Sequence, residues 1–430
     1  MTHSASDAFY RVEGGRRLQG EVVISGAKNS ALKLMAASLL ARGITTLSNI
    51  PRIADVLVMV EVLEYLGARV AFEAGVMRID TSGEIGSEAP YELVSRLRAS
   101  VNVLGPLLAR QGHARVAMPG GCNIGNRKID LHELGLALLG ASFHFDHGYL
   151  EAVAPELVGK RIMLEFPSRG ATENLLTAAA LARGSTVIDN AAREPDIVDL
   201  ARFLNRMGAK VAGAGSSTIL VEGVEQLSPA CYRVPSDPIE AGTFALCVLA
   251  TRGEAELVGT RPDDMAIFLY KLASTGARWA PSEKGMGVWI SSRPNAVDFA
   301  TLPYPGFPTD LQAPMMAYLA AAEGTSIITE NVFESRFLHV SELARMGAEI
   351  QVEGHHAVVR GVAGLQGAPV RARDLRGGAA LLVAAVSARG TSEIHGIHHI
   401  DRGYDDPVGK LRGLGAQAEC LSKERASALL

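Results

Sequence analysis

Two neighbouring side chains near the start of the sequence are suited to holding an anion. In residues 25–40, SGAKNSALKLMAASLL, Lys28 and Asn29 stand at the head of an apolar helix. The unpaired backbone N–H groups and the dipole of a helix start favour a bound phosphate. A solvated lysine is the ordinary alternative. The Ser-Gly turn before Lys28 suits the phosphate interpretation.

A glycine-rich loop carries a cysteine that could move a proton. In residues 118–132, MPGGCNIGNRKIDLH, Cys122 lies between glycines, with Arg127 and Lys128 close by in sequence. Cationic neighbours favour the reactive thiolate, whereas most cysteines are buried small hydrophobes. We favour the functional interpretation of Cys122. The loop matches no P-loop and no GxGxxG pattern, so its glycines alone do not indicate nucleotide binding.

The second half supplies a carboxylate and several guanidinium groups. Asp310 stands at a helix start in YPGFPTDLQA, where an N-cap aspartate is the simplest explanation. Arg336 lies among apolar residues in ENVFESRFLHV, and Arg376 and Arg402 lie in DLRGG and HHIDRGYDD. Pairing of the last two with nearby acids, Asp374 and Asp401, is the ordinary alternative. Together with Lys28 and Cys122, these groups suit a small, doubly anionic substrate with an acid and a base beside it.

The adjacent histidines at 355–356 and 398–399 could suggest a metal, but neighbouring side chains point apart on a helix or a strand. We therefore expect no metal site and no cofactor. The four cysteines are far apart without a CxxC pair, so free thiols are expected.

A repeated unit of about 70 residues must position these groups. A Gly-Ala pair recurs at Gly67, Gly140, Gly208, Gly276, Gly347 and Gly415, at intervals of 73, 68, 68, 71 and 68 residues. A second glycine precedes each pair by 23 to 28 residues. In the third copy, the patterns predict a helix over 171–182, a strand after Gly184, a helix over 196–207 and a further strand. Six such units predict an α/β protein.

Length and composition set the remaining limits. A chain of 430 residues with 48% hydrophobic and 20% charged residues is a globular protein of two or three domains. A net charge of −4 gives no general attraction to nucleic acid or to anionic membranes, so an anionic ligand needs a local cluster of cations. We therefore expect no nucleic-acid partner and no membrane partner, and no obligate protein partner is evident. No apolar run can span a bilayer, and the N-terminus lacks the apolar core of a signal peptide, so a cytoplasmic location is expected.

The segments that carry this chemistry resemble the UDP-N-acetylglucosamine enolpyruvyltransferase family. The resemblance runs through essentially the whole chain. It includes GAKN, LRASVNVLGPLLAR, PGGCNIG, GATENLL, NAAREPDIVDLARFL, FPTDLQ, ITENVFESRFLHV and HHIDRGYDD. The related shikimate enolpyruvyltransferases share the fold but lack the PGGC loop and GAKN.

The resemblance implies a two-domain, inside-out α/β barrel with three βαβαββ units in each domain and the active site in the interdomain cleft. One domain would span 21–235. The other would be discontinuous, with 1–20 joined to 236–430. The repeats alone predict two sets of three, with the weakest point of the pattern near 235–239.

The implied reaction transfers the enolpyruvyl group of phosphoenolpyruvate to the 3-hydroxyl of UDP-N-acetylglucosamine and releases phosphate. It proceeds through a tetrahedral ketal and is the first committed step of peptidoglycan precursor synthesis. Asp310 would take the hydroxyl proton or orient the hydroxyl, and Cys122 would protonate the methylene carbon. The PGGC loop would close over the cleft as a lid. Cys122 would also be the target of the epoxide fosfomycin.

The resemblance also assigns the binding groups. The phosphoenolpyruvate ligands would be Lys28, Asn29, Arg127, Arg376 and Arg402, with Lys28 and Arg402 also counted as catalytic. The uridine nucleotide would be held by Asn29, Arg98, Arg127, Lys128, Ile129, Asp130, Leu131, Ser168, Arg169, Gly170, Thr309, Asp310, Val332 and Arg336.

The sequence departs from the family pattern at several places. Arg-Lys replaces Arg-Pro at 127–128, Ser-Arg-Gly replaces Ser-Val-Gly at 168–170, and Asp-Pro-Ile replaces Asp-Arg-Ile at 237–239. Arg-Gly-Gly occupies 376–378, where the family has Arg-Ala-Ser or Arg-Ala-Gly. The phosphoenolpyruvate ligands are all retained. The changes fall mainly near the second substrate, and therefore leave open a paralogue that enolpyruvylates UMP in peptidyl-nucleoside antibiotic synthesis. A silent nucleotide-binding scaffold is a third alternative, against which the retained Cys122 and Asp310 argue.

Overall fold

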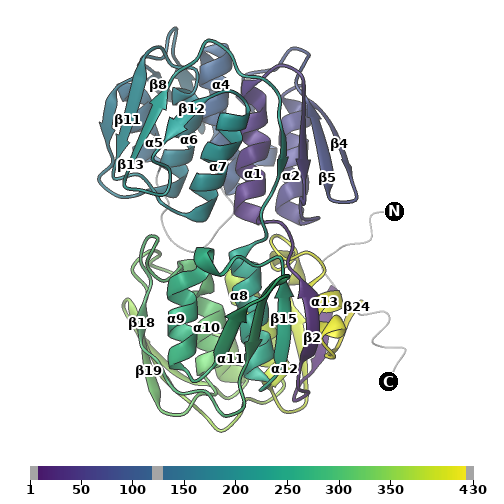
Figure 1. The fold of residues 1–430 in the computed structure, drawn as a ribbon. Helices are drawn as coiled ribbons and strands as arrows, with labels where there is room; N and C mark the ends of the chain where they lie inside the picture. Colours follow the sequence, from purple (N-terminus) through teal and green to yellow (C-terminus); the bar gives the residue numbers. More distant parts are fainter. Residues whose placement is uncertain (1–7, 119–128, 423–430) are drawn as a thin grey trace. The chain divides into compact units, whose positions relative to one another are not determined.

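The chain forms two compact units, each with its own hydrophobic core (Figure 1). The computed structural model describes residues 8–118 and 129–422. Within them, the N-terminal unit comprises 26–118 and 129–235, and the C-terminal unit comprises 8–25 and 236–422. The family resemblance implies a first boundary after residue 20, whereas in the structure it follows Ser25. The reason is that strand β2 (Gln19–Val23) pairs with β15 (Glu254–Val258) of the C-terminal unit.

The N-terminal unit consists of three copies of the repeat. Its first copy contains α1 (Lys28–Ala37), η2 (Ser38–Leu40), β3 (Ile44–Ser48), α2 (Ala54–Tyr65), β4 (Arg69–Glu73), β5 (Val76–Asp80) and β6 (Glu88–Ala89). The second contains α3 (Tyr91–Val94), η3 (Arg98–Val103), α4 (Leu104–Gln111), β7 (His113–Ala117), α5 (Asp130–Leu138), β8 (Ser142–Asp146), β9 (Tyr149–Val153) and β10 (Arg161–Met163). The third contains α6 (Arg169–Ala179), β11 (Ser185–Asp189), α7 (Pro195–Arg206), β12 (Lys210–Ala212), β13 (Thr218–Glu222) and β14 (Cys231–Arg233).

The C-terminal unit repeats this order three times. Its first copy contains α8 (Pro238–Ala250), β15, η4 (Pro262–Met265), α9 (Ala266–Ser274), β16 (Arg278–Pro281), β17 (Gly285–Trp289) and β18 (Phe299–Ala300). The second contains η5 (Thr309–Leu311), α10 (Gln312–Leu319), β19 (Thr325–Thr329), α11 (Val340–Arg345), β20 (Glu349–Glu353), β21 (His356–Arg360) and β22 (Pro369–Arg371). The third contains α12 (Leu375–Ser387), β23 (Thr391–His395), η6 (Ile397–His399), α13 (Pro407–Gly413) and β24 (Gln417–Ser422), and is completed by β1 (Ala8–Glu13).

The described strands form six four-stranded sheets of one pattern. In the order β10-β11-β13-β12, the first pair is parallel and the others are antiparallel, with Ser185 opposite Glu222. Strand β14 turns back to pair with β3, which joins the last copy of the N-terminal unit to its first. In the C-terminal unit, β1 pairs with β23 and β24, and β2 pairs with β15. Strand β1 thus completes the sheet of the last copy of the repeat, and β2 completes the sheet that contains β15, β16 and β17.

Each unit places helices inside and sheets outside. Helices α8, α10 and α12 pack against one another and are buried around nearly their whole circumference, as are α1, α4 and α6 in the N-terminal unit. A helix that is apolar or small on every side must be buried, which explains the alanine-rich sequences. The α/β inside-out fold and its six units are therefore confirmed. Within the described residues, no helix is both long and apolar enough to cross a membrane.

The Gly-Ala pairs end the outer helices. All six glycines have φ between 87° and 112°. After α2, Gly67 N–H donates to the carbonyl of Glu64 and Ala68 N–H to that of Leu63, both at 3.0 Å. This is a Schellman motif, which requires a left-handed residue that glycine adopts without strain. The pattern that revealed the repeat is thus the helix C-terminus of each copy.

Candidate active site

Asp310 is the centre of a charge cluster in the C-terminal unit. Its Oδ1 lies 2.6 Å from Nη2 of Arg336, and its Oδ2 lies 2.9 Å from Nη2 of Arg376. The two arginine side chains are 4–5% exposed and that of Asp310 is 23% exposed. A carboxylate has about four lone-pair sites, so Asp310 can accept a further hydrogen bond from its exposed side. Asp310 is not the N-cap of its helix, since η5 starts at Thr309 with Pro308 in the capping position.

Glu330 supports this cluster by hydrogen-bonding the residues next to it. It is fully buried and accepts hydrogen bonds from the Thr309 hydroxyl at 2.9 Å and the Val332 amide at 2.8 Å. Arg336 Nη1 donates to Thr309 Oγ1 at 2.7 Å, so the hydroxyl links the two charges. The Val332 N–H is thus used within the protein, and its carbonyl is the backbone group that a nucleotide could contact.

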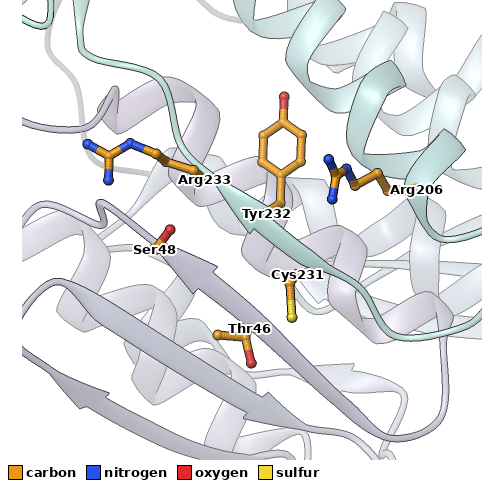
Figure 2. A pocket seen from close by; sticks show the side chains of 6 residues that line it. All are labelled: Thr46, Ser48, Arg206, Cys231, Tyr232 and Arg233. Atoms are coloured by element: carbon orange, nitrogen blue, oxygen red, sulfur yellow. The ribbon is translucent and has the colours of Figure 1, made fainter.

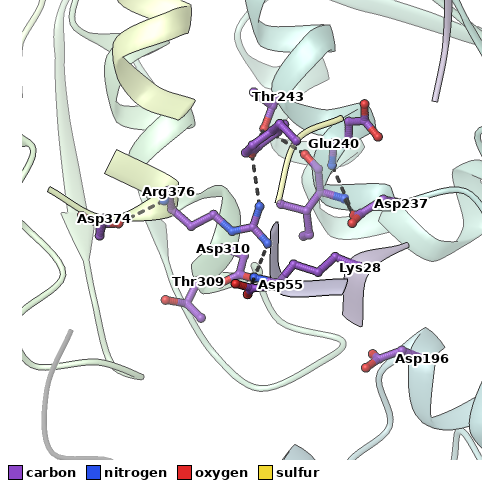
Figure 3. Close-up of polar contacts among 12 residues, drawn as sticks. Lys28, Asp55, Asp196, Asp237, Glu240, Thr243, Thr309, Asp310, Asp374 and Arg376 are labelled. Atoms are coloured by element: carbon purple, nitrogen blue, oxygen red, sulfur yellow. Dashed lines mark hydrogen bonds and ion pairs between the residues drawn. The ribbon is translucent and has the colours of Figure 1, made fainter. Parts of the chain in front are cut away.

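Arg376 is fixed at both ends. Asp374 caps α12 by accepting from the backbone N–H groups of Arg376 and Gly377 at 3.0 and 2.9 Å (Figure 3). The guanidinium donates to Tyr404 OH at 3.2 Å, and Tyr404 in turn hydrogen-bonds Thr243 at 2.8 Å. Burial opposes the charge of Arg376, but Asp310, Tyr404 and Asp237 together outweigh it, so the pKa of Arg376 is raised. The alternative pairing of its side chain with Asp374 is therefore wrong, because Asp374 serves the backbone and Asp310 the side chain.

His339 is buried next to the cluster and makes the stability of the folded protein depend on pH. Burial, assisted by Arg336 and opposed by Asp374, lowers the pKa of His339 to about 4. The unfolded chain therefore binds a proton between pH 6.5 and 4 that the folded chain does not, so stability falls as the pH falls through this window. The expected loss is about 3 kcal/mol of unfolding free energy.

Urea unfolding at pH 7, 5.5 and 4.5 tests this. Both tryptophans, Trp279 and Trp289, lie in the C-terminal unit, so their fluorescence reports its unfolding. We expect His339→Gln to flatten the acid loss and the exposed His355→Gln to retain it. Equal pH slopes for His339→Gln and wild type would contradict the assignment.

In the N-terminal unit, Lys28 is the first residue of α1. Its Nζ lies 2.6 Å from Oδ2 of Asp55, and both side chains are almost completely buried (Figure 3). The cap residue Ala27 makes no side-chain hydrogen bond to the helix start. Lys28 is thus a buried, oriented cation rather than a solvated lysine. Asn29 follows it and is half-buried.

Arg169 belongs to a buried charge cluster. Its Nη2 donates to Oδ1 of Asp196 at 2.8 Å, and Asp196 also pairs with Lys33. Lys33 lies 2.6 Å from Glu173, and burial lowers the pKa of Lys33 to about 8. The side chain of Arg169 is 36% exposed, so the substitution that departs from the family pattern is tied to the protein interior on one side.

The other predicted nucleotide contacts that the structure describes in this unit lie at or beside helix starts. Ser168 caps α6 by accepting from the Ala171 amide at 3.3 Å. Gly170 lies against the His132 ring, since a Cβ on Gly170 would be only 3.0 Å from it. The 168–170 turn therefore packs beside the segment that carries residues 129–131. Arg98 begins η3, which is joined to α6 by the hydrogen bond from Asn102 to Glu173 at 2.7 Å.

Arg402 lies in the turn after η6 and is half-buried. Burial, His398 and Arg402 together lower the pKa of His399, which places the Arg402 charge near that ring. Asp401 is held by Tyr10 OH at 2.5 Å. Cys122, Arg127 and Lys128 lie outside the described residues.

Two departures from the family pattern have local explanations. Pro238 occupies the first turn of α8, where its fixed φ suits a helix start, and Asp237 caps that helix. A Cβ on Gly377 would lie 2.7 Å from Asp374 Oδ2, and one on Gly378 would lie 2.5 Å from Ile400 Cγ1. Glycine therefore fits the close approach of these side chains to α12.

Sequence reasoning missed the supporting residues. These residues hold predicted site residues or the segments next to them. They are Asp55 beside Lys28, Glu330 beside Thr309, Tyr404 and Thr243 beside Arg376, and the pair Glu240–Lys410 beside Ser25. A charged residue inside an otherwise apolar helix, such as Glu240 in α8, is a signal that could have indicated burial with a partner.

A hollow of about 410 Å³ lies on the N-terminal unit beside the parallel pair β3–β14 (Figure 2). It contains no predicted site residue, so it does not mark the candidate active site. Its lining residues are Thr46, Ser48, Arg206, Cys231, Tyr232 and Arg233.

Comparison with known proteins identifies the family. The sequence model of the protein family EPSP synthase (3-phosphoshikimate 1-carboxyvinyltransferase) matches residues 12–411 of this chain. The chain belongs to this family. It is therefore an enzyme of the enolpyruvyl (1-carboxyvinyl) transferase class. Full-length relatives that are 50–52% identical confirm the resemblance seen in the sequence.

Individual relatives are similar over their whole length. The chain is 52% identical to a UDP-N-acetylglucosamine 1-carboxyvinyltransferase of Corynebacterium jeikeium and 50% identical to one of Thermotoga maritima, each over 96% of this chain and 99% of the relative. The solved structure of the enolpyruvyl transferase NikO from Streptomyces tendae is 25% identical, covers 97% of this chain and 99% of its own, and has a TM-score of 0.87. EPSP synthase from Acinetobacter baumannii, at 18% identity, 97% and 100% coverage and a TM-score of 0.74, shares the fold.

Proposed function

We propose that the chain transfers the enolpyruvyl group of phosphoenolpyruvate to the 3-hydroxyl of UDP-N-acetylglucosamine, the first committed step of peptidoglycan precursor synthesis. The observation that carries the proposal is the Asp310 carboxylate held between Arg336 and Arg376, in a chain about half identical to full-length relatives of that name. Because both substrates are water-soluble anionic metabolites, we place the reaction in the cytoplasm.

The proposed chemistry is an addition followed by an elimination. The sugar hydroxyl oxygen forms a bond to C2 of phosphoenolpyruvate while Asp310 accepts or orients the hydroxyl proton. Cys122 donates a proton to C3, which gives a tetrahedral ketal. Loss of a proton from the new methyl group and departure of phosphate then restore the double bond and leave the enolpyruvyl ether.

The cations serve the anionic groups. Lys28, Arg127, Arg376 and Arg402, with Asn29, would hold the phosphate and carboxylate of phosphoenolpyruvate and stabilise the developing charge. In this proposal Arg376 connects the two substrates, since it contacts the Asp310 carboxylate directly. The PGGC loop would close over the site and exclude water.

The proposed contacts to the acceptor nucleotide lie at the helix starts of the N-terminal unit and in the Asp310 cluster of the C-terminal unit. Arg98, the 127–131 stretch and the 168–170 turn would hold the nucleotide on the N-terminal unit. Thr309, the Val332 carbonyl and Arg336 would do so on the C-terminal unit. Lys128 and Arg169 remain the residues that suggest a different uridine nucleotide, although Arg169 is anchored by Asp196.

Phosphate release with each acceptor tests the function. We expect turnover with phosphoenolpyruvate and UDP-N-acetylglucosamine, and none above background with UMP. Release with UMP alone would instead identify the nucleoside-antibiotic type of transferase. Nucleotide binding without release from either acceptor would indicate a silent scaffold.

A further inference from the structure

The two connections between the units run side by side. Among the described residues, the chain passes between the units at Ser25–Gly26 and again at Pro235–Ser236. In the C-terminal unit the Asp237 amide donates to the Ser25 carbonyl at 2.8 Å. In the N-terminal unit the Ala27 amide donates to the Pro235 carbonyl at 2.7 Å. One backbone hydrogen bond in each unit therefore joins the two connections.

A buried ion pair in the C-terminal unit holds the first connection at Ser25, and the Asp237–Ser25 hydrogen bond joins the second connection to it. Glu240 Oε2 accepts from the Ser25 amide at 2.9 Å, and its other oxygen pairs with Lys410. Lys410 Nζ also donates to Ser25 Oγ at 2.6 Å. The side chains of Glu240 and Lys410 are 3% and 17% exposed. Burial raises the pKa of Glu240 to about 7 and Lys410 opposes this, so the carboxylate depends on its partner.

Helix α8 connects this ion pair to the Asp310 cluster. Asp237, Glu240 and Thr243 are spaced three residues apart, which places them along one face of the helix. Asp237 caps the helix by accepting from the Glu240 amide (Figure 3). The Glu240 side chain holds Ser25, and Thr243 hydrogen-bonds Tyr404. Tyr404 accepts from Arg376, and Arg376 contacts Asp310. A continuous series of contacts therefore leads from Glu240 along α8 to the guanidinium of Arg376.

We propose that Glu240 and Lys410 are positioning residues that couple the two interunit connections, through α8 and Tyr404, to the placement of Arg376 beside Asp310. Neither residue needs to touch a substrate for this role. The activity readout rests on the proposed function, whereas the exchange readout below does not. A purely structural ion pair would contribute to stability without linking these two regions.

Hydrogen–deuterium exchange of the ligand-free full chain provides the first test. We expect Lys410→Met to raise exchange at least about tenfold in peptides that contain the Ser25 and Asp237 amides, since opening of a buried amide becomes easier when its acceptor is destabilised. The matched control is Lys284→Met. Lys284 pairs with Glu21 at 2.6 Å on the strand that leads to Ser25, but this pair is more than half exposed. Protection at Ser25 and Asp237 equal to that of the control would overturn the proposal.

A double-mutant cycle tests the link to Arg376. Lys410→Met and Thr243→Val each interrupt the same path, so their effects on kcat/KM for phosphoenolpyruvate should be non-additive. We expect about a tenfold to hundredfold loss for each, little further loss for the double variant, and recovery with Lys410→Arg. Additive effects with unchanged exchange would reduce the pair to a structural role.

Two outcomes separate the possible failures. If wild type lacks transferase activity but Lys410→Met raises exchange at both connections, the proposed function fails and the positional role of the pair remains. If Lys410→Met does not fold, the isosteric Glu240→Gln takes its place with the same expected exchange. Unchanged exchange in that variant would also overturn the proposal.

Discussion

Asp310→Asn is expected to lower kcat by about 10²–10⁴, the usual contribution of a positioned acid or base. The amide keeps the size of the carboxylate but cannot accept the hydroxyl proton. Substrate affinity should change less than kcat, because Arg336 keeps its place in the turn before α11 and Arg376 keeps its place on α12. Phosphate release at saturating concentrations of both substrates measures the effect.

The same substitution should also affect stability. Arg336 and Arg376 are buried and would lose their shared counter-charge, which costs about 3 kcal/mol or more for a buried pair. Tryptophan fluorescence in urea measures this for the C-terminal unit. Asp298→Asn is the matched control, since Asp298 is exposed in the same unit and its carboxylate accepts a hydrogen bond from the Ile327 amide at 2.7 Å. A stable Asp310→Asn variant with normal kcat would remove Asp310 from the proposed chemistry.

The repeat made the fold predictable because each copy ends its outer helix in the same way. A Gly-Ala pair is a strong local signal, since the left-handed glycine and the two Schellman hydrogen bonds depend only on neighbouring residues. The place of the N-terminus could not be found in this way. Strands β1 and β2 belong to the C-terminal unit through pairing with β23, β24 and β15, and such distant pairing leaves no periodic trace in the sequence.

The candidate site was predicted through its unusual residues, but their partners were not. Motif resemblance indicated Asp310, Arg336 and Arg376, and the structure joins all three. It did not indicate that Asp55 would neutralise Lys28, because the two residues lie on different helices. Proximity in sequence was misleading for Arg376: its near neighbour Asp374 caps a helix, and the distant Asp310 takes the charge.

The same reasoning applies to Arg169. As a departure from the family pattern it suggested a new contact to the acceptor, and this remains a prediction. The structure adds a second role, since Arg169 and Lys33 share Asp196. A buried aspartate between two cations is a tertiary arrangement, and three separate helices contribute to it. No single segment of the sequence could have revealed it.

Cys122→Ala is expected to lower kcat by about 10²–10⁴, because the proposed proton donor to C3 is lost. Fosfomycin provides a second readout, since its epoxide should alkylate one thiol of the wild type in the presence of the nucleotide. Mass spectrometry of the digested protein should locate the adduct on Cys122. Cys122→Asp should resist the drug and retain part of the activity, because a carboxylic acid can also donate a proton.

The other cysteines make this test specific. Burial raises the pKa of Cys247 to about 12 and raises that of Cys420, which disfavours the reactive thiolate at both positions. Cys231, like Cys420, is exposed, and Cys231→Ser is the matched control that should keep both the adduct and the activity. An adduct on Cys231, or an unmodified Cys122 after prolonged exposure with the nucleotide bound, would contradict the assignment. Thiolate character and exposure together decide alkylation, and the nearby cations Arg127 and Lys128 predict selective modification of Cys122.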